Sequence, residues 1–442
     1  MKIGVISLGC AKNLVDTEIM LGRLMERGWE LVHDLSQADL ILINTCGFIG
    51  PAKEESINSI LEAVRYKQPG IGICSKVVVA GCLVQRYPAE LAAEIPEVDL
   101  WIGLGEIAEL PELLEGAPAA RRADLTKAPF LNDSNVRRYR VTVPHLAYVK
   151  IAEGCNHRCS YCAIPLIKGN FRSRRPESII DEIKQLVESG TREINLIAQD
   201  ITMYGKDLSP GLNLAGLLRR IISEANPPWI RLLYAYPSRI DAELLDLISA
   251  APNLCKYLDL PIQHIHPRLL KLMNRHDPPE LIRERLAQIR EAIPGIALRT
   301  TMIVGFPTET EAEFEALQSF VAEGHFQHLG VFNYSREEGT AAYRLKPRIS
   351  GRVMESRRER LMNTQRQISN RLLKEFVGRE RIALIDRLTA GDQAIGRTEA
   401  FAPEVDGWLE IDGCAAKEGQ FVRVAVTGSD DYRLFAKYLS EV

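Results

Sequence analysis

Short apolar runs alternate with helical patterns of hydrophobic residues over residues 1–108. Such alternation predicts an open parallel sheet with helices on both of its faces. The run KIGVISLG comes first, and Gly28 follows the first helical pattern, at a position where helices commonly stop. The predicted strands are 2–9, 29–34, 38–44, 76–80 and 100–103, and the predicted helices are 16–25, 52–66 and 88–94.

The same pattern repeats about six times over residues 146–335. Repeated parallel strand–helix units in one stretch predict a barrel or a partial barrel. Pro176 fits the first turn of a helix, and Gly190 and Gly324 fit helix ends. The predicted strands are 147–152, 193–198, 230–235, 257–260, 297–304 and 328–334, with helices that include 176–189, 241–249, 281–292 and 311–323.

The pattern changes again after residue 350. Residues 351–376 predict one basic helix, and residues 377–442 contain short β-branched runs separated by Gly, Asp and Pro. These runs, at 381–388, 407–412, 421–428 and 433–439, predict a small antiparallel β-barrel. We therefore expect an α/β protein with three domains, joined by a linker within 109–143. The predicted domains are an open parallel sheet at 1–135, a partial (β/α)6 barrel with a trailing helix at 141–372, and the small β-barrel at 375–442.

The composition is that of an ordinary folded protein, with 46% hydrophobic and 26% charged residues. A formal net charge of −3 gives no overall indication of a nucleic-acid or membrane-surface partner. No apolar run approaches the ~18 residues that span a bilayer. The first residues, MKIGVISLGC, turn polar too soon for the core of a signal peptide. We therefore expect a cytoplasmic protein with no membrane partner.

The chain has nine cysteines, and an odd number in a cytoplasmic protein argues against a disulfide framework. Clustered cysteines then indicate metal binding or catalysis. Cys74 and Cys255 come before their predicted strands, at the edge opposite to the expected site, and Cys414 lies in the C-terminal module. We expect these three to be structural.

Three cysteines form one compact motif, GCNHRCSYC, directly after the first predicted barrel strand. Barrel active sites are built at the ends of these strands. Cys155, Cys159 and Cys162 have C-x3-C-x2-C spacing, and three thiolates on one loop suit an iron–sulfur cluster. Three ligands leave one iron open, a position where a substrate can bind. The alternative is a structural zinc site completed by His157, which is poorly placed inside the triplet, or by a distant histidine.

Three other cysteines are far apart in sequence but equivalent in position. Cys10, Cys46 and Cys82 each follow a predicted parallel strand of the N-terminal sheet, at the edge where ligands bind in such folds. Each lies beside a glycine that allows a bulky ligand to approach the backbone closely. The alternative for a single free cysteine is a small buried hydrophobic residue. Three of them at equivalent strand ends instead favour a second cluster with an open iron.

These motifs carry a family resemblance. The triplet followed by a barrel resembles the radical S-adenosylmethionine superfamily. The segments GCAKNLVDTE (9–18), INTCGFI (43–49) and AGCLVQRY (80–87) are similar to the N-terminal domain of its methylthiotransferase family, whose C-terminal module is a TRAM-type barrel. The layout of that family covers almost the whole chain. The first two segments are most similar to the branch that modifies a ribosomal protein rather than tRNA.

The resemblance implies an enzyme with two [4Fe–4S] clusters that uses S-adenosyl-L-methionine. One molecule of it supplies a methyl group to a sulfur on the N-terminal cluster, and a second is cleaved to a radical that activates the substrate carbon. The implied reaction adds a methylthio group to the β-carbon of an aspartate in the small-subunit ribosomal protein of the decoding centre. The implied partners are that basic protein, met alone or on the ribosome, and a reductant protein. The implied metal ligands are Cys10, Cys46, Cys82, Cys155, Cys159 and Cys162.

Polar residues follow the other predicted barrel strands, and barrel geometry directs such residues towards the site. They are candidates for binding the ribose, the adenine or the methionine end of the cofactor, and loop capping or solvation is the alternative. The glycine in IVGFPTET allows the adenine to pack closely. The candidate cofactor-binding residues are Gln199, Asp200, Gln263, Gly305 and Glu309.

The charge of residues 377–442 bears on the choice of substrate, because RNA binding normally needs a basic face. This module has eight Lys and Arg against twelve Asp and Glu. An acidic module disfavours RNA and suits a basic ribosomal protein. A tRNA adenosine methylthiotransferase is the first alternative. A non-enzymatic iron–sulfur electron-transfer or cluster-carrier protein is the second, and the polar strand ends of the barrel disfavour it.

Overall fold

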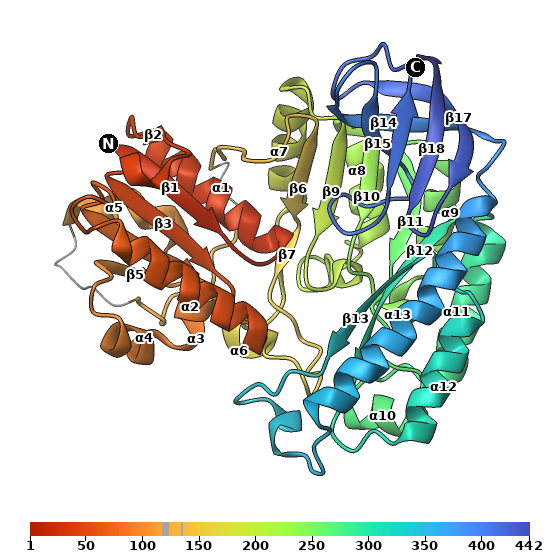
Figure 1. Cartoon of the computed structure of the whole chain (residues 1–442), viewed down its shortest axis with the longest axis horizontal. Helices are drawn as coiled ribbons and strands as arrows, with labels where there is room; N and C mark the ends of the chain where they lie inside the picture. Colours follow the sequence, from red (N-terminus) through yellow and green to blue (C-terminus); the bar gives the residue numbers. More distant parts are fainter. Residues whose placement is uncertain (117–122, 134–135) are drawn as a thin grey trace.

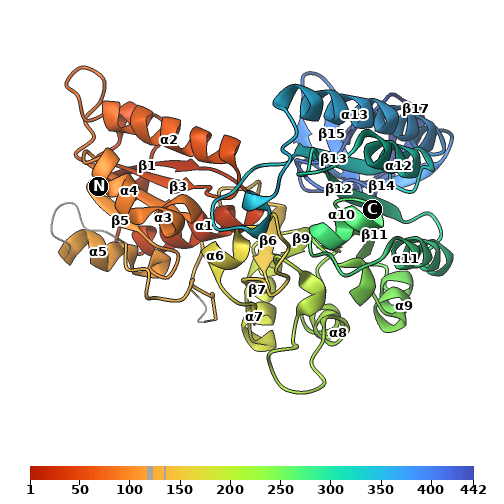
Figure 2. The same cartoon turned by 90° about the horizontal axis from the view of Figure 1, so that it is seen from below.

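The computed structural model describes residues 1–116, 123–133 and 136–442. Its strands form an N-terminal parallel sheet, a central parallel sheet and a C-terminal closed barrel (Figure 1). The N-terminal sheet and the C-terminal barrel lie on different sides of the central sheet in both views (Figures 1 and 2). Among the described residues, none of the helices has the length and apolarity required to cross a bilayer.

The N-terminal sheet is parallel throughout, with the strand order β2-β1-β3-β4-β5. After β1 the chain adds β2 on one side of β1 and then adds β3 on the other side, so the strand order reverses between β1 and β3. Ligands bind at such a reversal, outside the carboxyl ends of the strands. Its elements are β1 (Lys2–Ser7), α1 (Ala11–Met25), β2 (Glu30–Leu31), β3 (Leu40–Thr45), α2 (Gly50–Arg65), β4 (Lys76–Gly81), α3 (Cys82–Arg86), α4 (Pro88–Glu94) and β5 (Leu100–Ile102).

The central sheet has the parallel order β13-β12-β11-β10-β9-β6 and forms the predicted partial barrel. Helices connect successive strands and cover its outer face (Figures 1 and 2). Its strands are β6 (Leu146–Lys150), β9 (Glu193–Ile197), β10 (Trp229–Leu232), β11 (Leu254–Asp259), β12 (Ala297–Val304) and β13 (His328–Asn333). Its helices are α6 (Ile164–Lys168), α7 (Pro176–Glu188), α8 (Leu214–Glu224), α9 (Ala242–Ala250), α10 (Pro267–Leu272), α11 (Pro279–Ala292) and α12 (Glu311–Ala322).

The long helix α13 (Gly351–Lys374) packs on β13 and α12 and leads into the C-terminal barrel (Figure 1). The predicted small barrel is present and closes in the order β14-β15-β16-β18-β17, although the sequence did not predict β15. Its pairs are antiparallel except that β16 and β18 run in parallel. The strands are β14 (Glu380–Leu388), β15 (Ala394–Thr398), β16 (Trp408–Asp412), β17 (Phe421–Ser429) and β18 (Arg433–Glu441).

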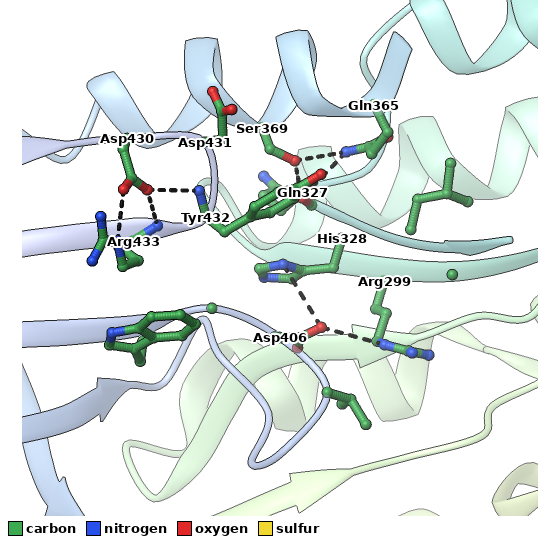
Figure 3. A pocket seen from close by; sticks show the side chains of 15 residues that line it. Arg299, Gln327, His328, Gln365, Ser369, Asp406, Asp430, Asp431, Tyr432 and Arg433 are labelled. Carbon is green, nitrogen blue, oxygen red and sulfur yellow. Dashed lines mark hydrogen bonds and ion pairs between the residues drawn. The ribbon is translucent and has the colours of Figure 1, made fainter. Parts of the chain in front are cut away.

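A groove of about 550 Å³ lies where the C-terminal barrel meets the central sheet (Figure 3). Asp406 of the barrel accepts a hydrogen bond from Tyr257 at 2.7 Å and lies 3.3 Å from Arg299 and 3.7 Å from His328. Arg397 of the barrel forms a 2.7 Å ion pair with Glu193. These partners lie towards the amino ends of their strands. The groove is therefore a junction between parts of the chain, at the edge of the sheet opposite to the predicted site.

Several boundaries differ from the sequence prediction for a physical reason. Helix α1 begins at Ala11, not at residue 16, because its first turns bury the polar Lys12, Asn13 and Asp16 and so carry no amphipathic pattern. Within 109–143, predicted to be a linker, α5 (Leu110–Gly116) forms, while residues 117–122 and 134–135 lie outside the described part. The short antiparallel pair β7 (Ala152–Glu153) and β8 (Arg172–Ser173) was not predicted, because two-residue strands leave no periodic signal.

Candidate active site

The three cysteines of the N-terminal sheet lie together at the carboxyl edge of β1, β3 and β4. The ends of these strands are level, since Ser7 pairs with Asn44 and Thr45 pairs with Gly81. Cys10 is the N-cap of α1, Cys46 follows β3, and Cys82 is the first residue of α3. This edge includes the reversal of strand order between β1 and β3.

Close contacts bring the three cysteine loops to one place. A Cβ atom built on Gly9, next to Cys10, would lie 3.3 Å from the sulfur of Cys46. The sulfur of Cys82 lies 3.4 Å from Oδ1 of Asn13, one helical turn beyond Cys10. The amide of Asn13 also donates to the backbone oxygens of Leu8 and Thr45, at 3.2 and 2.9 Å. Asn13, in the first motif, thus connects the loops of Cys10, Cys46 and Cys82 through its side-chain amide.

Gly47 allows the closest of these backbone approaches. A Cβ atom there would lie 2.6 Å from the carbonyl oxygen of Cys82 and 2.8 Å from Cα of Leu83. Both are backbone atoms of the short helix α3. An added Cβ atom could therefore fit only if the loop of Gly47 moved away from α3. We expect Gly47→Ala to lower the free energy of unfolding by about 1–3 kcal/mol. We also expect it to lower the iron bound by this trio, measured by iron and sulfide analysis of anaerobically reconstituted protein.

The matched control for that prediction is Gly351→Ala, at the start of α13. A Cβ atom at Gly351 would have no neighbour within 4 Å. This variant is expected to retain the iron content and the stability of the unmodified protein. Equal iron in both variants would contradict the assigned role of the Gly47 contact.

The triplet of the central domain lies on a tight loop between β7 and α6. The backbone N–H of Cys155 donates to Gly169 at 3.1 Å, and that of Cys162 donates to Cys159 at 3.1 Å. Gly154 has φ +80°, and a Cβ atom there would lie 2.1 Å from the backbone oxygen of Asn170, so only glycine fits. The loop therefore holds its three sulfurs over the carboxyl edge of the central sheet.

His157, inside the triplet, is held by other residues of the site. Its Nε2 lies 2.6 Å from Oδ2 of Asp200, and its ring stacks on Tyr236 with centroids 4.3 Å apart. Oδ1 of the same carboxylate accepts from the backbone N–H of Thr202 at 2.9 Å. These contacts engage the Nε2 atom and a ring face of His157, which argues against the zinc alternative with this residue as fourth ligand.

The thiols of each trio influence one another electrostatically. Burial raises the pKa of Cys82 to about 12, where Lys168 lowers it and Cys10 and Cys46 raise it. Burial also raises the pKa of Cys155 to about 11, and Cys159 adds to this rise. The raised pKa values of Cys82 and Cys155 keep these two thiols protonated at neutral pH, so a metal must displace their protons to bind the sulfurs. In the described part of the chain, no set of three or more His, Cys, Asp or Glu side chains is already arranged to hold a metal ion.

Two of the predicted cofactor contacts are amides at the carboxyl edge of the central sheet. Gln199 follows β9 and donates from Nε2 to Glu153 at 3.0 Å, while its buried Oε1 has no hydrogen-bond partner among the described residues. Gln263 follows β11 with φ +77°, and its backbone forms an isolated parallel β-bridge with Met302 of β12. Both side chains lie at the edge where the cysteine triplet is placed.

Two more predicted contacts, Gly305 and Glu309, lie on the loop after β12, where protein groups surround the Glu309 carboxylate. Oε2 of Glu309 accepts from the backbone N–H of Gly305 at 2.5 Å and pairs with Arg357 at 2.7 Å. Its Oε1 lies 3.2 Å from His264. Gly305 has φ +73°, and a Cβ atom there would meet Met354 of α13 at 2.1 Å. Glu309 thus fixes this loop against α13.

A buried charge network, not predicted from the sequence, lies between the N-terminal and central sheets. Lys150 of β6 lies 2.6 Å from Asp16 of α1 and 2.7 Å from Glu153, and all three side chains are at most 2% exposed. Lys168 of α6 approaches the same two carboxylates at 3.4 and 3.3 Å. Burial raises the pKa of Glu153, but Lys150 and Lys168 lower it by more, so it lies well below its usual value. The sequence offered one signal of this network, because the charged Lys150 and Glu153 interrupt the otherwise apolar segment LAYVKIAEG.

A second ionic contact joins the loop after β13 to the N-terminal sheet. Glu337, which is buried, lies 2.8 Å from Lys53 and 2.5 Å from Arg86. Arg86 also donates to the backbone oxygen of Gly47 at 3.0 Å. The central domain therefore contacts the N-terminal domain at two places, through Glu337 and through the Asp16 network.

Comparisons with known families divide the chain in the same order as its sheets. Residues 2–103 match the family described as "Uncharacterized protein family UPF0004", residues 149–321 match the "Radical SAM superfamily", and residues 377–439 match the "TRAM domain". The first two matches contain the N-terminal trio and the triplet, respectively.

Similarity to curated proteins extends over the whole chain. A protein of Heliobacterium modesticaldum named "Ribosomal protein uS12 methylthiotransferase RimO" is 45% identical over 100% of this chain and 96% of its own length. A protein of Geobacter sulfurreducens with the same name is 45% identical over 99% of both chains. One from Acetivibrio thermocellus is 44% identical over 100% of this chain and 99% of its own.

Solved structures resemble the fold at low sequence identity. The radical S-adenosylmethionine methyltransferase TsrM from Kitasatospora setae has a TM-score of 0.57 at 19% identity, covering 77% of this chain and 76% of its own. The cobalamin-dependent S-adenosylmethionine radical enzyme OxsB has a TM-score of 0.54 at 12% identity, covering 82% and 56%. At these identities the likenesses concern the fold alone.

Proposed function

Because the chain belongs to the family of ribosomal protein uS12 methylthiotransferases, we propose that it adds a methylthio group to an aspartate of ribosomal protein uS12. The observation that carries this proposal is the identity of 45% over essentially the full length of both chains. The aspartate β-carbon is the proposed acceptor, as the resemblance of the first motifs implies. The parts at 1–135, 141–372 and 375–442 are the proposed domains of this transferase.

We propose that Cys155, Cys159 and Cys162 hold a [4Fe–4S] cluster. The fit rests on three sulfur donors on one loop, on the burial that raises the pKa of Cys155 and Cys162, and on the engagement of His157 elsewhere. Thiolates are the ligands that such clusters use. The half-buried Arg275 lowers the pKa of Cys155 and Cys162 and so supplies positive charge beside an anionic cluster.

We propose a second [4Fe–4S] cluster on Cys10, Cys46 and Cys82. Its support is the convergence of three strand-end loops, held by Asn13 and by the close approach at Gly47. When bound, the two clusters and S-adenosyl-L-methionine would supply the electron, the radical and the sulfur that this transfer requires. An external protein is the proposed electron donor.

The residues around the triplet position this chemistry. Gln199, with its unpaired buried oxygen, and Gln263 are proposed as direct contacts of S-adenosyl-L-methionine. Asp200 is proposed to act through His157, and Glu309 through the backbone of Gly305, because their carboxylate oxygens already contact these groups.

The test is incubation of reconstituted, reduced protein with S-adenosyl-L-methionine and small ribosomal subunits that lack the modification. We expect the mass of protein uS12 to increase by one methylthio group, together with formation of 5′-deoxyadenosine. Modification of tRNA adenosine alone would reject this function in favour of the tRNA enzyme. Absence of deoxyadenosine would favour a non-enzymatic cluster protein.

A further inference from the structure

The ammonium group of Lys12 is buried near the N-terminal trio without a carboxylate partner. The residue is 8% exposed and forms no ion pair among the described residues. Its Nζ has one long hydrogen bond, 3.4 Å to the backbone oxygen of Ala198, and lies 3.5 Å from the centre of the Tyr234 ring. The neighbouring Lys150 and Lys168 differ, since each contacts Asp16 and Glu153.

The position of this group is between the two cysteine trios. Lys12 is in the first turn of α1, two residues after Cys10. Ala198 follows β9 and Tyr234 follows β10, so both contacts are at the carboxyl edge of the central sheet. A substrate carbon that receives sulfur from one trio and is activated at the other must lie in this region.

The chemistry of the free donors indicates the ligand. An ammonium has three N–H donors, and burying one without a counter-charge costs free energy. Its hydrogen bonds to a carboxylate are short and strong. A carboxylate from outside the chain therefore fits this position better than a neutral amide.

We propose that Lys12 binds the side-chain carboxylate of the substrate residue and thereby places the adjacent carbon between the two trios. This inference rests on the proposed function and adds the group that recognises an acidic residue. Lys12 is thus a substrate-binding residue that distinguishes aspartate from asparagine. Lys168 instead influences the thiols of the trio, because it lowers the pKa of Cys82.

The test compares two peptides that copy the target segment of ribosomal protein uS12, one with the aspartate and one with asparagine in its place. Their affinities for reconstituted protein are measured by fluorescence anisotropy. We expect Lys12→Met to weaken binding of the aspartate peptide by about 10- to 100-fold, the value of a charged hydrogen bond. Lys12→Met should leave the affinity for the asparagine peptide almost unchanged. Lys12→Arg should restore part of the preference for the aspartate peptide. The control Lys184→Met removes a surface lysine of α7 and should behave as the unmodified protein.

The outcomes separate this inference from the function on which it rests. If Lys12→Met keeps the preference for aspartate, the inference is wrong while the function stands. If it lowers the iron and sulfide content, Lys12 belongs to the cluster site and the inference is also wrong. If the unmodified protein neither binds the aspartate peptide nor modifies uS12, the proposed function fails, and the assignment of Lys12 fails with it.

Discussion

Replacing Cys162 with alanine is expected to reduce deoxyadenosine formation to the level seen without reductant and to remove about half of the bound iron. The reason is that the loop offers three sulfurs and no substitute for any of them. His157, the nearest other ligand by sequence, is held by Asp200 at 2.6 Å and stacked on Tyr236. The measurements are iron and sulfide analysis of anaerobically reconstituted protein and chromatography of the deoxyadenosine product.

Two further variants make this result specific. Cys82→Ala should also lose about half of the iron and should stop methylthio transfer, but it should leave deoxyadenosine formation intact. Cys255→Ala is the matched control, because Cys255 is a buried cysteine near the amino end of β11, away from both trios. Full iron in Cys162→Ala, or loss of deoxyadenosine in Cys82→Ala, would contradict the assignment of one cluster to each trio.

The sequence predicted the sheets and the placement of the cysteines because both depend on local patterns. Apolar runs such as 297–304 coincide with the observed β12. The N-terminal cysteines each follow such a predicted run by one or two residues, so predicting parallel strands also predicted that these residues share an edge. Predicting the fold required only the periodicity of apolar residues and the rule that the carboxyl ends of parallel strands lie at the same edge of the sheet.

Contacts between distant segments could not be predicted in this way. Asp16 and Lys150 are separated by 134 positions, and nothing local indicates that they meet. The same holds for Glu309, which the sequence places at a strand end but which the structure pairs with Arg357 of α13. Polar residues at such positions are indistinguishable by sequence until their partners are known. The start of α1 was missed for this reason, since its buried polar residues contact another domain.

The Asp16 network is expected to contribute more to stability than any surface ion pair. Asp16→Asn would leave Lys150 and Lys168 buried with only Glu153 between them, where Asp16 now lies 2.6 Å from Lys150. Removing one partner of a buried pair typically costs about 3–5 kcal/mol, because the remaining charge is uncompensated. We expect a loss of that size in the free energy of unfolding, measured by urea denaturation of the reconstituted protein. Since α1 also carries Lys12, affinity for the aspartate peptide of uS12 is the second readout of whether the domains stay in place.

The control for this prediction is Glu177→Gln, which breaks the exposed 2.7 Å pair with Arg220. Exposed pairs contribute about 0–1 kcal/mol, because solvent and salt screen them. The double variant Asp16→Asn with Lys150→Met removes the uncompensated ammonium and should recover part of the loss. A cost for Asp16→Asn no larger than that for Glu177→Gln would show that the network does not hold the two sheets together. Recovery in the double variant would show that the stability cost of Asp16→Asn arises from the uncompensated ammonium of Lys150.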